Sequence, residues 1–337
     1  MKKVIIGVHG LGNKPPKYLL KRWWQKSMLE GLKKGGHKKV LPEFELVYWA
    51  DILYDEPLNL WESNKESPYY LYEPYKKSPK DFYLEDHPIT QKIVGFISDQ
   101  LNRIFLNPDM TLNHSFITDA ILKRYFRDLE IYYNEECKDE FDMTCKAKEL
   151  IRRRVVDTIY RYRDYEIMII AHSMGSIITF DALTFVIPEI KINTLVTIGS
   201  PLGLPVVVSK IAAEQKKMIN GKSIMSTPPG VTDSWYNLAD ILDRVALNYK
   251  LGDDFNKNEN GVIPRDYLVQ NDYEIDGDKN HHKSYGYLRT PEFSNILNEF
   301  IGDEKLSVTK KVFGKVQQIV ENMKLQSEKV RDRLNID

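Results

Sequence analysis

The sequence predicts an α/β protein in which a mostly parallel central sheet is flanked by helices, and three observations lead to this prediction. Nearly continuous apolar runs rich in β-branched residues occur at 3–8 and 166–171, as is typical of strands buried on both faces of a parallel sheet. Apolar residues at helical spacing over 18–34 separate the first run from a second strand at 44–49. Because parallel neighbours cannot be joined by a tight turn, this order implies a right-handed crossover.

The same alternation of predicted strands and helices resumes in the second half of the chain. There the pattern predicts a helix at 175–186 and further strands at 194–198 and 235–239. Between the two halves, 55–83 is rich in tyrosine and proline without a clean period, and amphipathic helices are predicted at 89–105, 116–133 and 147–162. We therefore expect a core of 1–51 and 146–303, a mostly helical insertion at 52–145, and a long amphipathic C-terminal helix within 304–337.

Composition narrows the class of protein. The chain has 337 residues, 42% of them hydrophobic, which is enough for a sizeable core. The 48 Lys and Arg balance the 48 Asp and Glu, so no net charge favours nucleic acid as a partner. The only cysteines, Cys137 and Cys145, show no zinc spacing, and neither a structural zinc nor a disulfide framework is expected.

The location of the protein can also be predicted from the sequence. The apolar run after Met1 is too short for a signal peptide and has no small-residue cleavage site after it, so we interpret it as the first strand. No stretch approaches the roughly 18 apolar residues of a membrane span. We expect a cytoplasmic protein with no transmembrane segment.

The most informative residues are AHSMG at 171–175, between a predicted buried strand and a predicted helix. This context is typical of a nucleophile elbow, in which a serine occupies a sharp, strained turn. The residues two before and two after the serine must be small for strand and helix to approach, and Ala171 and Gly175 are small. The pattern predicts Ser173 as a catalytic nucleophile.

A serine nucleophile needs an imidazole to accept its proton and a carboxylate to orient that imidazole. In this architecture the acid and then the histidine follow the serine, and the only downstream histidines are His281 and His282. Asp240 and Asp243 both follow the strand at 235–239. We favour Asp243, because an apolar residue that could anchor its loop follows nearby, and His282, with Asp240 and His281 as the alternatives.

Other polar residues near the predicted site have different expected roles. The backbone N–H groups of Met174, which follows the nucleophile, and of Leu11, which lies between two glycines after the first strand, are the predicted oxyanion donors. His9 and His172 do not fit the required order and are expected to be structural, bonded to the backbone. Ser200 is expected to be a turn residue.

Several short motifs resemble the lipase and esterase branch of the α/β-hydrolase superfamily. VHGLG at 8–12 resembles the oxyanion loop of bacterial lipases, AHSMG their alanine-containing elbow, and TIGSPLG at 197–203 a strand-end segment of larger lipase-like deacylases. DRVA at 243–246 and HKSY at 282–285 are similar to the acid and histidine loops. The resemblance implies an α/β-hydrolase fold in which the insertion at 52–145 is a lid or cap.

These residues predict a serine hydrolase that cleaves a carboxylic ester through an acyl-enzyme, with no metal or organic cofactor. A thioesterase, amidase or acyltransferase would use the same residues, and a non-catalytic interaction protein on a hydrolase scaffold is the alternative from another class. The expected partner is a small-molecule or lipid acyl ester. The basic face of the C-terminal helix fits self-association, contact with a membrane surface, or packing on its own domain.

Overall fold

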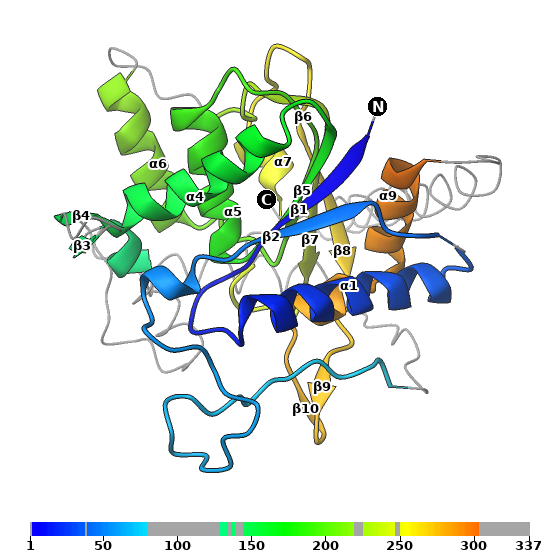
Figure 1. Ribbon diagram of the computed structural model, residues 1–337. Helices are drawn as coiled ribbons and strands as arrows, with labels where there is room; N and C mark the ends of the chain where they lie inside the picture. The colour runs from blue at the N-terminus through cyan, green and yellow to red at the C-terminus, as the bar shows by residue number, and fades with distance from the viewer. Residues whose placement is uncertain are drawn as a thin grey trace, which may run out of the picture.

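A six-stranded parallel sheet forms the centre of the protein (Figure 1). The computed structural model describes residues 2–37, 39–79, 129–133, 136–138, 144–218, 225–246 and 250–302. The sheet order is β2-β1-β5-β6-β7-β8, and every neighbouring pair is parallel. Its strands are β1 (Lys3–Val8), β2 (Glu43–Val47), β5 (Glu166–His172), β6 (Ile192–Ile198), β7 (Val231–Asp240) and β8 (Pro264–Val269).

Helices cover both faces of this sheet, as parallel strands require. One face is covered by α1 (Lys17–Lys34), α8 (Ser284–Tyr287) and α9 (Pro291–Ile301). The opposite face packs against α4 (Ala147–Arg161), α5 (Met174–Asp181), α6 (Pro205–Met218) and the short α7 (Leu251–Asp254). Figure 1 shows α1 and α9 on one side of the sheet and α4 and α5 on the other. The predicted α/β class, with a mostly parallel sheet flanked by helices, is confirmed.

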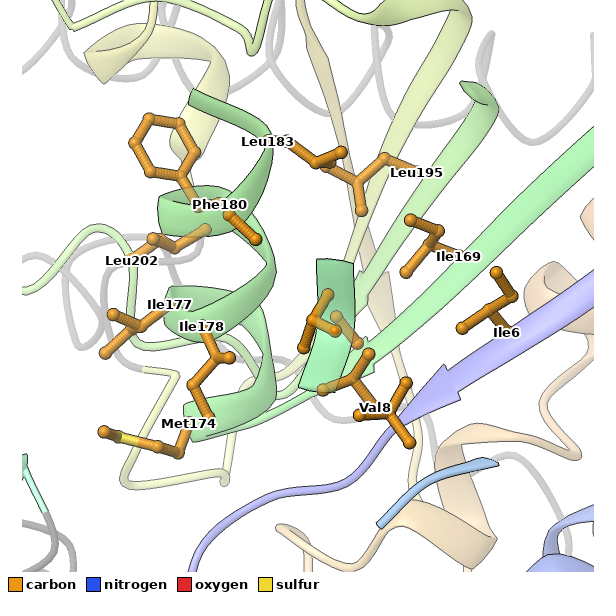
Figure 2. Close-up of a cluster of buried hydrophobic side chains, with 14 of the residues drawn as sticks. Ile6, Val8, Ile169, Met174, Ile177, Ile178, Phe180, Leu183, Leu195 and Leu202 are labelled. Carbon is orange, nitrogen blue, oxygen red and sulfur yellow. The ribbon is translucent and has the colours of Figure 1, made fainter. Parts of the chain in front are cut away.

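The alternation of side chains along β1 divides the core into two layers. Ile6 and Val8 point to the α4 and α5 side, whereas Ile5 points to the α1 and α9 side. Gly7 also faces α1, and a Cβ atom there would lie 3.0 Å from the ring of Trp24. Figure 2 shows apolar side chains of α5, among them Ile178, packed against those of the strands. All eight residues of α5 are buried, which fixes the helix that begins next to Ser173.

Most predicted core elements are present, with shifted ends. β2 ends at Val47 and a 3-10 turn at Ala50–Ile52 follows it. The predicted helix at 175–186 is α-helical only to Asp181, after which Ala182–Val186 forms a π-helical turn. β7 begins several residues earlier than predicted, at Val231. Sequence reasoning missed α6, β8 and α9.

The insertion is only partly within the described residues. Residues 53–79 form no regular helix, 129–133 are helical, and β3 (Glu136–Lys138) pairs antiparallel with β4 (Thr144–Lys146). A small hairpin, β9 (Glu274–Ile275) with β10 (Asp278–Lys279), lies just before the two adjacent histidines. The predicted helix at 89–105 and the C-terminal helix within 304–337 lie outside the described residues. Within the described ranges, no helix is both long and apolar enough to cross a membrane.

Candidate active site

The candidate site lies where the strand order of the sheet reverses. β1 has β2 on one side and β5 on the other, so the loops that leave β1 and β5 diverge at their carboxyl ends. In open α/β sheets this switch point is where ligands bind. Ser173 follows β5 directly and Gly10 follows β1 at the same edge. The two are in close contact, because a Cβ atom on Gly10 would lie 2.8 Å from Cβ of Ser173.

Ser173 has an unusual backbone conformation. Its φ of 54° and ψ of −127° place it in a region that glycine favours, yet it is a fully buried serine. The helix that begins after it passes very close to β1, since a Cβ atom on Gly175 would lie 2.5 Å from the carbonyl oxygen of Val8. The small residue expected two positions after the serine is therefore required by backbone contact. Ala171, two positions before, is completely buried in β5.

Ser173, His282 and Asp243 form a continuous row of hydrogen bonds. Nε2 of His282 lies 2.8 Å from Oγ of Ser173. On the other side of the ring, Nδ1 lies 2.9 Å and 2.8 Å from the two carboxylate oxygens of Asp243. A carboxylate only accepts, so Nδ1 carries the proton and Nε2 is left to accept from the serine hydroxyl. The structure thus brings together the three side chains that the sequence singled out.

The two alternative residues form a separate pair beside this row. Nδ1 of His281 lies 3.3 Å from Oδ2 of Asp240. The same carboxylate accepts 2.6 Å and 2.8 Å hydrogen bonds from the backbone N–H groups of Asn271 and Leu242. Asp240 therefore bonds to one N–H of its own loop, to one N–H of the segment after β8 and to the neighbouring histidine, whereas Asp243 contacts the imidazole next to Ser173.

Asp243 is buried and fully supplied with donors. Besides the imidazole, the backbone N–H of Val245 donates to Oδ1 at 2.9 Å and the hydroxyl of Tyr287 donates to Oδ2 at 2.7 Å. Gly199, at φ 55°, lies directly against this group. A Cβ atom there would lie 2.9 Å from Oδ2 of Asp243 and 3.2 Å from Nδ1 of His282. A larger residue at position 199 would therefore displace the acid and the imidazole.

His9 and His172 bond to the backbone, as expected. Nε2 of His172 donates to the carbonyl oxygen of His282 at 2.7 Å, and the two rings lie 4.9 Å apart. Nδ1 of His9 donates to the carbonyl of Gly10, while Nε2 accepts from the backbone N–H of Trp49 at 3.0 Å. Burial lowers the pKa of both imidazoles well below the usual value, and the nearby charge of Lys14 adds to the effect. Both rings are neutral, and their hydrogen bonds to the backbone stabilise the loops around Ser173.

The two predicted oxyanion donors belong to segments that adjoin Ser173. Met174 is the first residue of α5, where N–H groups have no partner within the helix. Leu11 follows Gly10, the residue in contact with Ser173. The ammonium group of Lys14 donates to the carbonyl oxygens of Leu11 and Gly12 and so holds this loop from one side.

The histidine loop at 280–283 is tied down by residues that sequence reasoning did not identify. The side-chain amide of Asn271 donates to the carbonyl oxygens of His281 and Lys283 at 2.9 Å and 2.8 Å. Oδ1 of Asn280 accepts from the backbone N–H of His282 at 2.9 Å. Neither asparagine belongs to a motif, so nothing in the sequence marks it. Ser200 is a turn residue, as predicted, since its hydroxyl accepts from the N–H of Leu202 at 3.3 Å.

Part of the insertion contacts both loops of the site. The N–H of Leu58 donates to the carbonyl of Lys14 at 2.9 Å, and Glu73 accepts from Lys283 at 2.8 Å and from the side-chain amide of Asn280. Burial acts to raise the pKa of Glu73, but the charge of Lys283 and these hydrogen bonds outweigh it and lower the pKa to about 2. Among the residues that the structure describes, no group of three or more potential ligands could hold a metal ion.

Comparisons with known proteins add no relative: no protein-family model matches the chain, and no curated protein sequence matches it. A functional assignment therefore depends on the residues and geometry of the site itself.

Proposed function

We propose that this protein is a serine hydrolase with an α/β-hydrolase fold that cleaves carboxylic esters. The observation that carries the proposal is the row of hydrogen bonds from Ser173 through His282 to Asp243, at 2.8 Å on the serine side and 2.8–2.9 Å on the acid side. These distances lie within hydrogen-bond reach for a nucleophile, its base and the group that orients the base.

In the proposed reaction, Oγ of Ser173 attacks the ester carbonyl carbon while its proton passes to Nε2 of His282. The C–O bond to the alcohol then breaks, the alcohol takes the proton from the imidazolium, and an acyl-enzyme remains. Water repeats the sequence, giving its proton to His282 and releasing the acid and the free serine. Throughout, Asp243 holds Nδ1–H and so keeps Nε2 facing the serine.

The tetrahedral intermediates carry a negative oxygen, which needs fixed donors. We assign this role to the backbone N–H groups of Met174 and Leu11. The first belongs to the N-terminus of α5, where the helix dipole favours negative charge. The second belongs to a loop that Lys14 holds through two carbonyl oxygens.

We further propose that the insertion shapes the entrance for the substrate. Its described part joins the loop after β1 through Leu58 and joins the histidine loop through Glu73. Leu60, Trp61 and Tyr72 of the same segment are exposed. Exposed apolar side chains on a segment that is bonded to both loops are suited to contact with an acyl group, which supports an acyl ester as the substrate.

A fluorophosphonate probe tests the proposed activity, since it phosphonylates an activated serine. We expect covalent labelling and hydrolysis of a p-nitrophenyl acyl ester, both lost in Ser173→Ala. The matched control is Ser200→Ala, a buried serine near the site whose hydroxyl only caps a turn, and it should retain both. Folded wild-type protein that neither labels nor hydrolyses esters of short or long acyl chains would overturn the proposal in favour of a non-catalytic scaffold.

A further inference from the structure

We propose that Tyr287 is a positioning residue of the hydrolytic site, whose buried hydroxyl fixes the Asp243 carboxylate in the orientation that holds the imidazole of His282. This inference rests on the proposed function but concerns a residue outside the serine, histidine and acid that carry out the reaction. Tyr287 is the last residue of α8, five positions after His282.

The direction of the hydrogen bonds at the Tyr287 hydroxyl is fixed by its partners. The backbone N–H of Asp240 can only donate, and it lies 2.9 Å from the hydroxyl oxygen. The single hydroxyl proton is therefore available for the other neighbour, Oδ2 of Asp243, at 2.7 Å. Burial, and next the charge of Asp243, raise the pKa of Tyr287 well above its usual value, so the hydroxyl keeps its proton.

This donor completes the environment of a carboxylate that has no contact with water. The side chain of Asp243 has an exposed fraction of 0%. Oδ1 is held by the N–H of Val245 and Oδ2 by Tyr287, so that the plane of the carboxylate is anchored at both oxygens while His282 approaches from a third direction. Without the hydroxyl, Oδ2 keeps only its contact with the imidazole that it must orient, and the carboxylate gains freedom to turn about its own axis.

The ring of Tyr287 is itself confined, which makes the hydroxyl a precise anchor. The side chain is fully buried, and a Cβ atom on Gly199 would lie 3.1 Å from the ring at Cε2. Its hydroxyl also fastens Asp240, at the end of β7, to α8. One side chain thus connects the strand end, the acid loop and the helix that follows the histidine loop.

Replacing the tyrosine by phenylalanine removes only the hydroxyl, and Tyr273→Phe is a matched control. Tyr273 is a buried tyrosine on the same side of the sheet, but its hydroxyl donates to the carbonyl of Pro74 at 2.7 Å. We expect Tyr287→Phe to lower kcat about 10- to 100-fold, because the lost hydrogen bond is made to the charged carboxylate that orients the imidazole of His282. KM should stay within about twofold of wild type, because the hydroxyl acts on the orientation of the imidazole and not on substrate binding. Tyr273→Phe should leave kcat within about twofold.

A second measurement does not depend on turnover. The proton on Nδ1 of His282 gives a low-field ¹H NMR resonance when it is bonded to a carboxylate, and its disappearance in Asp243→Asn assigns it. We expect this resonance to shift or vanish in Tyr287→Phe and to stay in place in Tyr273→Phe. It should also shift in Tyr287→3-fluorotyrosine, which retains the ring and hydroxyl, adds a single small atom to the ring, and makes the proton a stronger donor.

The two readouts separate the two proposals. An active wild type together with a folded Tyr287→Phe of unchanged kcat and unchanged resonance would overturn the positioning role and leave the hydrolase intact. An inactive wild type would overturn the hydrolase, and the resonance would still decide whether Tyr287 holds Asp243. If Tyr287→Phe does not fold, an unmoved resonance in Tyr287→3-fluorotyrosine overturns the inference.

Discussion

The backbone of Ser173 predicts a reversal of the usual ranking of alanine and glycine. Both Ser173→Ala and Ser173→Gly delete the hydroxyl and its contact with His282, so the two variants differ only in the Cβ atom. At φ 54° and ψ −127° a Cβ atom is strained, and such conformations cost on the order of 1–3 kcal/mol. The glycine variant relieves this strain but loses about 0.4–1 kcal/mol through the greater freedom of its unfolded chain. We therefore expect Ser173→Gly to be more stable than Ser173→Ala by about 1.3 kcal/mol, the difference between the middle values of these two ranges.

The free energies of unfolding of the two variants, measured by urea denaturation, test this expectation. Ser176 supplies the control, because it is a buried serine of α5 whose helical position favours alanine over glycine by about 1 kcal/mol. The ranking of the alanine and glycine variants should therefore be opposite at positions 173 and 176. If Ser173→Ala is as stable as Ser173→Gly or more stable, the conclusion that the backbone of Ser173 is strained is wrong.

Two further predictions concern ionisable groups. The lowered pKa values of His9 and His172 mean that the unfolded chain binds two protons that the fold excludes, so the stability they contribute is present above pH 6.5 and lost below it. The free energy of unfolding, measured by urea denaturation at each pH, should fall by about 2 kcal/mol between pH 6.5 and 5.5. In His172→Gln it should fall only about half as much over the same interval. An unchanged pH dependence in this variant would contradict a buried neutral ring at position 172. In ester hydrolysis, Asp243→Asn should lower kcat by several orders of magnitude, because it disturbs the tautomer of His282, whereas Asp240→Asn should cost much less; the opposite order would show that the roles of the two acids are exchanged.

Local sequence patterns predicted the part of the site that is built by consecutive residues. The elbow at Ser173 was predictable because a buried strand, a small residue, a serine and Gly175 follow one another in the chain. The same patterns could not distinguish Asp243 from Asp240, since both follow β7 within a few residues. That difference depends on which carboxylate contacts which imidazole in the folded protein. It is set by the conformation of the turn that contains the two acids, and no local sequence pattern predicts this conformation.

The elements that were missed have physical reasons of their own. β8 is an edge strand with exposed and half-exposed positions, so its sequence PRDYLV lacks the apolar run of the central strands. α9 did carry signals, because Thr290 caps it through its side chain and Pro291 stands at its first position. Tyr287 and Asn271 could not have been found, because their partners are distant in sequence and no local pattern requires a tyrosine or an asparagine there.

The contacts of the histidine loop link the proposed chemistry to the proposed substrate entrance. The carbonyl of His282 accepts from His172, its N–H is held by Asn280, and its ring contacts Asp243, so the imidazole has little freedom before any substrate arrives. Fixed groups of this kind are what a site needs to stabilise a transition state without first rearranging. Asn280 also donates to Glu73 in the insertion. Any substrate that displaces this part of the insertion therefore acts on a residue bonded to the backbone of His282, which connects substrate choice to the position of the proposed base.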